Sequence, residues 1–240
     1  MAEKKQTLEK RGERKPVTEK KPLAEERQVV ERARDFWSKY NKPILIASAA
    51  IIILGGGYLV YKYMFKEPQE TKAAEAMFRA EQYFKIDSFQ LALRGDGVNP
   101  GFVKIIDKYG GTKAGNLARY YAGACFLQTG DFAKAAKYLK DFDTKSKPVQ
   151  ARAYKLLGDA YAELGRNSDA LAAYKKAARE FEEDDNNASE YLFMAAYFAE
   201  RVMRNSKEAI QLFKELKEKY PKTEKGFEAD KYLAQLGVYN

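Results

Sequence analysis

The chain has 240 residues, with 43 Lys and Arg against 34 Asp and Glu, a formal net charge of +9, one cysteine and no histidine. The absence of histidine excludes imidazole acid-base catalysis, histidine-based triads and histidine metal sites from this chain. The single cysteine, Cys125, excludes an intramolecular disulfide. We therefore predict a protein that is not an enzyme and that needs no metal or cofactor.

The first 42 residues are strongly polar and contain two different segments. Residues 1–23 hold many charges and few apolar side chains, which predicts a disordered basic tail. Residues 24–42 predict an amphipathic helix beside a membrane, whether it lies on the lipid surface or docks on a partner. Its apolar side chains recur at helical spacing: Val29, Ala33, Phe36, Trp37 and Tyr40. Asn41 and Pro43 then permit a bend.

Residues 43–65 form the apolar segment of the chain. From Ile44 to Phe65 there are 22 residues, of which nine are Ile, Leu or Val and one, Lys62, is charged. As a helix with a rise of about 1.5 Å per residue, this stretch reaches roughly 33 Å, against about 30 Å for the hydrocarbon core of a bilayer. The sequence therefore predicts a transmembrane helix over residues 43–65.

The apolar segment is predicted to remain as an anchor. A cleaved signal peptide fits poorly, because the charged region before the segment is 42 residues long and no A-x-A site follows it. Residues 1–42 hold 13 Lys and Arg against 8 Asp and Glu, whereas the 18 residues after the span hold three Lys and Arg. This asymmetry predicts a cytoplasmic N-terminus and a periplasmic C-terminal domain. Because the basic excess lies beside the membrane, we predict contact with membrane lipid and no binding of nucleic acid.

Residues 66–240 are predicted to form one all-α domain. Runs rich in Ala, Leu, Tyr, Lys and Glu are separated by short Gly, Asp and Asn breaks. Residues 153–180, AYKLLGDAYAELGRNSDALAAYKKAARE, place the small Gly158 and Ala170 where two paired helices approach closely, and Gly165 at the turn between them. This pattern resembles the tetratricopeptide repeat, which implies a short α-solenoid of antiparallel helix pairs.

The repeat pattern recurs on both sides of this copy. In the copy that follows, Tyr197 replaces the small residue and Arg204 replaces the turn glycine, after a polar break predicted at residues 182–189. The predicted units are an atypical opening repeat at 70–109, repeats at about 116–149, 151–184 and 190–222, and a capping helix at 223–236.

The resemblance implies a partner-binding groove lined by fixed positions of each first helix. In this chain those positions predict a groove that is apolar at both ends and charged in the middle. The groove residues are Leu117, Tyr120 and Leu127 in the first clear repeat, Arg152, Lys155 and Asp159 in the second, and Tyr191, Met194, Phe198 and Arg201 in the third. The sequence leaves open whether the third set is exposed or covered by the C-terminal helix.

The basic tail, the single span and the repeats together resemble the YfgM-type proteins, ancillary inner-membrane subunits of the SecYEG translocon. The stretch AEAMFRAEQYFKIDSFQLALRGDG resembles the opening region of that family, whereas the long N-terminal tail departs from it. The resemblance implies a scaffold or chaperone accessory of the bacterial inner membrane, working beside a PpiD-like periplasmic chaperone on unfolded or emerging polypeptides. The alternative is a structural assembly factor for another cell-envelope complex.

Overall fold

The computed structural model describes residues 22–239, and the chain divides into two compact units, residues 1–62 and residues 63–240. Most of the predicted tail at residues 1–23 lies outside the described residues. Within the described part every regular element is a helix, and the one β-bridge joins Gly95 to Pro100. The all-α fold class is therefore confirmed.

The first unit contains one long helix, α1 (Pro22–Val60), with Pro43 in its interior. The helix therefore continues through Pro43, where the missing backbone N–H removes one hydrogen bond and permits a bend without ending the helix. A π-helical turn, η1 (Tyr61–Lys66), follows. The helical stretch Arg27–Lys85 contains an 18-residue window of mean hydropathy 2.2 with none of it buried, so by length and composition it suffices to cross a membrane.

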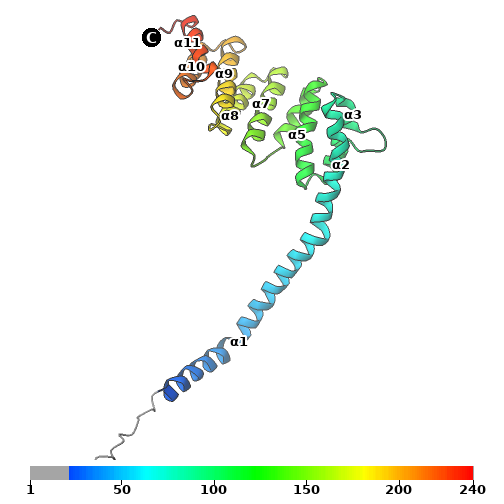
Figure 1. The fold of residues 1–240 in the computed structure, drawn as a ribbon, viewed down its shortest axis with the longest axis vertical. Helices are drawn as coiled ribbons and strands as arrows, with labels where there is room; N and C mark the ends of the chain where they lie inside the picture. The colour runs from blue at the N-terminus through cyan, green and yellow to red at the C-terminus, as the bar shows by residue number, and fades with distance from the viewer. Residues whose placement is uncertain (1–21, 240) are drawn as a thin grey trace, which may run out of the picture. The chain divides into compact units, whose positions relative to one another are not determined.

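The second unit is a succession of helices in which consecutive helices pack side by side (Figure 1). From α5 onward they form the pairs α5/α6, α7/α8 and α9/α10, and α11 packs on α9 and α10. The helices are α2 (Glu67–Lys85), α3 (Phe89–Arg94), α4 (Phe102–Tyr109), α5 (Lys113–Gln128), α6 (Phe132–Lys140), α7 (Lys147–Glu163), α8 (Asn167–Glu180), α9 (Asp185–Arg201), α10 (Ser206–Lys219) and α11 (Glu224–Gln235).

Short polar side chains begin several of these helices. The side chains of Thr112, Asp131, Asp184, Asn205 and Thr223 each accept a hydrogen bond from the backbone N–H three residues further on. The polar break predicted at residues 182–189 is shorter than expected, because Asp184 caps α9 and the helix already begins at Asp185. The acidic and amide residues there form the cap and first turn of a helix. Carboxylates in this position interact favourably with the positive end of the helix dipole.

Small residues let the paired helices approach closely. A Cβ added at Gly158 on α7 would lie 2.5 Å from the ring of Tyr174 on α8, and one added at Gly123 on α5 would lie 2.4 Å from Leu139 on α6. The buried side chains form two clusters, one from α2 to α8 and the other from α8 to α11, and Tyr161 packs against both. The core is therefore continuous along the stack, as expected when each pair buries its neighbour's apolar face.

Candidate functional site: the inner face of the repeats

Three predicted groove residues come together from three successive first helices. Tyr120 lies on α5, Arg152 on α7 and Tyr191 on α9. Burial raises the pKa of both tyrosine hydroxyls, while the positive charge of Arg152 acts on both in the opposite direction. Tyr191 also raises the pKa of Tyr120, so these side chains lie within electrostatic range of one another. The stacking of repeats thus creates a surface that no single helix contains.

A cavity of about 360 Å³ opens beside two of these residues, Arg152 and Tyr191. Arg152 and Tyr191 line it together with the N-terminal end of α7 and the region where α8 passes into α9. Its remaining lining residues are Pro148, Ala151, Phe181 and Asn187. Such a volume lies within the usual range of about 300–1,000 Å³ for ligand sites. An exposed arginine and a tyrosine in the same lining offer both hydrogen bonds and aromatic contact area.

The other two charged groove residues of the second repeat, Lys155 and Asp159, are already engaged in contacts within the domain. Lys155 donates from Nζ to Asp159 Oδ2 at 2.7 Å, and the Tyr174 hydroxyl donates to Asp159 Oδ1 at 3.0 Å. Burial first, and then the carboxylate of Asp159, raise the pKa of Tyr174 far above its ordinary value. The Lys155–Asp159 pair lies within α7, whereas the Tyr174 hydrogen bond joins α8 to α7, so this part of the face contributes to stability as well as to the surface.

The apolar groove residues divide into two groups. Leu117, Leu127 and Met194 are half-buried and pack against the two core clusters, so each keeps some exposed surface. The structure does not place Phe198 on the groove surface as predicted. Its side chain is 8% exposed, and its ring meets that of Tyr174 edge-on at 5.4 Å between centroids. Phe198 is therefore a core residue. Its helical position is right for the groove, but the bulk of Tyr174 from the preceding repeat covers it.

The C-terminal helix covers a different row of aromatic residues. Tyr232 on α11 packs against Phe193 at 5.2 Å, Phe213 at 5.0 Å and Tyr197 at 6.0 Å between ring centroids. Tyr191 remains half-buried and Arg201 exposed, with the Arg201 guanidinium 5.7 Å from the Tyr197 ring. The third repeat thus keeps part of its predicted inner face open.

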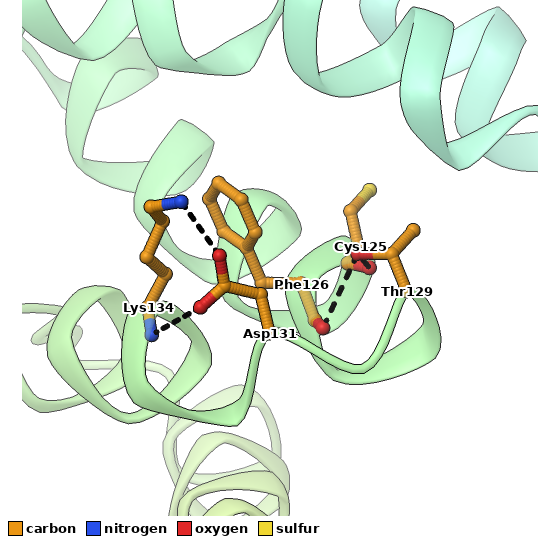
Figure 2. Close-up of polar contacts among 5 residues, drawn as sticks. All are labelled: Cys125, Phe126, Thr129, Asp131 and Lys134. Carbon is orange, nitrogen blue, oxygen red and sulfur yellow. Dashed lines mark hydrogen bonds and ion pairs between the residues drawn. The ribbon is translucent and has the colours of Figure 1, made fainter.

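The single thiol is inert in this fold, as the apolar sequence around it indicates. Cys125 is buried on α5, and burial raises the pKa of its thiol to about 12. The hydroxyl of Thr129 donates to the backbone carbonyl of Cys125 at 3.0 Å, a contact shown in Figure 2. Among residues 22–239 no group of three Cys, Asp or Glu side chains is arranged to hold a metal ion.

Sequence reasoning placed no site in the opening repeat, but the structure has two cavities there. One of about 490 Å³ and one of about 250 Å³ share Arg94 and Lys104 in their walls. Arg94 on α3 and Lys108 on α4 have no acidic residue three or four positions away, whereas Lys104 has Asp107 three residues further on; the two unpartnered cations are the local signal that could have drawn attention to this region.

The geometry defines a class of protein: a stack of antiparallel helix pairs with tightly packed small residues, following a long apolar helix. Tetratricopeptide repeat models match this stack over residues 138–188 and, with a second model, over residues 117–145 and 190–223. No curated protein and no solved structure matches the chain. The chain thus carries tetratricopeptide repeats, which generally act as non-enzymatic scaffolds that bind protein partners.

Proposed function

We propose that this protein is a membrane-anchored scaffold or chaperone accessory at the SecYEG translocon, which binds a partner or an emerging polypeptide through the inner face of its repeats. The observation that carries the proposal is the cavity of about 360 Å³ lined by Arg152 and Tyr191, with Tyr120 within electrostatic range of both. Aromatic and arginine side chains are the residues that most often dominate binding energy at protein interfaces.

The apolar helix supports the membrane part of the proposal. The excess of Lys and Arg before the span supports a cytoplasmic N-terminus and a periplasmic repeat domain. A membrane tether raises the effective concentration of a groove at a neighbouring channel toward the millimolar range, about what a weak peptide site requires. The assignment to the translocon and to a PpiD-like chaperone rests on the resemblance to the YfgM-type proteins.

Site-specific photocrosslinking in native membranes tests the proposal. A photoreactive residue at Tyr120 or Tyr191 should capture SecY, a PpiD-like chaperone or emerging chains, and one at the exposed Lys137 or Lys176 on the second helices should not. Capture of envelope-assembly proteins without translocon subunits would favour the alternative, an assembly factor. Reaction only at the second-helix positions would contradict the inner-face assignment itself.

A charge reversal sharpens the same test. Arg152→Glu should lower capture at Tyr120 several-fold, because the charge of Arg152 acts on both tyrosines and Arg152 makes no ion pair in the described part of the chain. Arg179→Glu, an exposed change on α8, is the matched control and should leave capture unchanged. Protease treatment of spheroplasts, which should digest residues 66–240, tests the orientation independently.

A further inference from the structure

The opening part of the repeat domain contains a recess away from the inner face. Its larger cavity, about 490 Å³, is walled by α3, α4, the end of α5 and α6. A second cavity of about 250 Å³ lies under the loop between α3 and α4, and both cavities are lined by Arg94 and Lys104. None of the predicted groove residues lines either cavity.

The floor of the larger cavity is aromatic. The rings of Phe126 on α5 and Tyr138 on α6 stack at 5.5 Å between centroids with 4° between their planes. Leu93 and Val103 complete the apolar part of the lining. Burial raises the pKa of the Tyr138 hydroxyl, which places this ring partly out of water. A further aromatic or large aliphatic side chain would find stacking and apolar contacts here.

The acidic residue at the edge of this floor is already engaged. Asp131 accepts a hydrogen bond from the Lys134 ammonium at 2.6 Å and another from the Lys134 backbone N–H at 3.2 Å, as Figure 2 shows. These contacts lower the pKa of Asp131 and fix the start of α6. The Lys134 ammonium also lies 5.3 Å from the centroid of the Phe126 ring. The charges of Asp131 and Lys134 therefore offset each other, and this ion pair adds no net charge to the cavity wall.

The remaining charge around the two cavities is predominantly positive. Arg94, Lys104 and Lys108 line the cavities, and within residues 22–239 none of the three makes an ion pair. Among the lining residues, Asp107 is the one acid outside the Asp131–Lys134 pair. Asp96, in the neighbouring loop, is engaged by hydrogen bonds from the Asn99 backbone and side chain, the Val98 backbone and the Tyr83 hydroxyl, and its pKa is well below the ordinary value.

The loop that closes the smaller cavity is held in one shape. Gly95 and Gly97 have φ of +84° and +94°, and a Cβ at Gly95 would lie 2.1 Å from the carbonyl oxygen of Asn99. The loop presents Val98 at 90% exposure beside the cations. A preformed wall reduces the entropy lost when a ligand binds.

We propose that this recess binds an acidic, aromatic-containing segment of a polypeptide, with an aromatic side chain on the Phe126–Tyr138 floor and carboxylates on Arg94 and Lys104. Charge complementarity selects an acidic occupant, because three cations that make no ion pair within the described residues line the cavities against one acid, Asp107, outside the Asp131–Lys134 pair. Two cavities joined through shared cations suit several consecutive residues of an extended chain. An acyl chain would instead require a lining free of so many charges. This second surface is independent of the inner-face proposal.

Fluorescence anisotropy with the full chain in nanodiscs tests the proposal. The probe is a fluorescein-labelled peptide, Gly-Asp-Asp-Phe-Asp-Gly, compared with versions that carry Lys for Asp or Ala for Phe. The first peptide should bind, and each substitution should weaken binding by about ten-fold or more. Absence of binding at about 1 mM of the acidic aromatic peptide, or equal binding of the basic one, overturns the proposal.

Variants locate the binding. Arg94→Glu with Lys104→Glu should weaken binding about ten-fold, whereas the matched reversal Lys140→Glu on α6 should leave it unchanged. All three positions are exposed, so thermal unfolding should keep its wild-type midpoint. If Arg152→Glu abolished binding instead, the peptide would be bound at the inner face and not in the recess, which would overturn the proposal. Binding of phosphatidylglycerol vesicles through Arg94 and Lys104, without binding of the peptide, would also overturn it.

Discussion

The second and third repeats solve the same packing problem with different residues. In α7/α8, Gly158 receives the ring of Tyr174, and the Tyr174 hydroxyl donates to Asp159. In α9/α10, Tyr197 stands at the position of Gly158. The positions of Tyr174 and Asp159 are occupied by Phe213 and Phe198, so two phenyl rings replace the polar pair. The first arrangement depends on close approach and a partly buried hydrogen bond, and the second on aromatic bulk.

The bulky Tyr197 is accommodated in the third repeat because a single helix, α11, follows this repeat in place of another helix pair. Tyr197 is 42% exposed and turns toward α11, where its ring lies 6.0 Å from that of Tyr232. Tyr232 also stacks on Phe213 at 5.0 Å with 11° between the planes. A capping helix thus supplies the contacts that a closely approaching partner supplies in the second repeat, and a degenerate repeat can end the stack without leaving its core open.

The largest expected effect is at the close approach itself. Gly158→Val should destabilise the domain by about 2–3 kcal/mol, because the new side chain overlaps a Tyr174 ring that Asp159 holds in place. Urea unfolding of the full chain in detergent, followed by circular dichroism, measures the loss. Gly111→Ala, where an added Cβ meets nothing within 4 Å, should change stability by less than about 0.5 kcal/mol. An unchanged midpoint for Gly158→Val would contradict the packing described.

Exchanging the two partner rings tests the polar pair. Tyr174→Phe should cost about 1 kcal/mol, because it removes the hydrogen bond to Asp159. Phe213→Tyr should also destabilise, by about 1–3 kcal/mol, because Phe213 is fully buried among rings and the new hydroxyl has no acceptor such as Asp159 beside it. Equal stability of both variants and the wild type in urea would show that the two arrangements are interchangeable.

The turns of the two repeats differ in a way that predicts a stabilising change. Gly165 has φ of +69°, and Arg204 adopts the same left-handed region at +55° without being glycine. Arg204→Gly should therefore stabilise the domain by about 0.5–1 kcal/mol, and Gly165→Arg should destabilise it by about 1–2 kcal/mol. Thermal unfolding midpoints of the two variants should move in opposite directions. A lower midpoint for Arg204→Gly would indicate that its side chain makes a compensating contact.

The smallest expected effect concerns the ion pair that joins the two repeats. Lys175 on α8 donates to Glu208 on α10 at 2.7 Å, and the side chains are 29% and 25% exposed. A double-mutant cycle with Lys175→Met and Glu208→Gln should give a coupling of about 0.5 kcal/mol that falls as salt is added. The more exposed pair of Lys147 and Glu183 is the control, with coupling near zero. A salt-independent coupling would contradict an electrostatic link.

The local features of this protein were determined by its sequence. Helical periodicity, capping side chains and the spacing of Gly158, Gly165 and Ala170 depend on neighbours within one or two turns, so the all-α class and the repeats could be predicted. The apolar run from Ile44 to Phe65 likewise predicts a helix long enough for a membrane. The start of α9 could not be placed, because Asp184 acts as a helix cap in a stretch whose composition is that of a loop.

Features that depend on contacts between distant residues were decided only by the tertiary structure. Phe198 has the helical position of a groove residue, yet Tyr174 from the preceding pair buries it. Tyr120, Arg152 and Tyr191 are separated by more than 30 residues, and only the stacking of repeats brings them together. The recess around Arg94 and Lys104 requires four helices to meet. Periodicity fixes which side of a helix is apolar, but the side chain that covers a given position comes from another helix, and no local pattern specifies it.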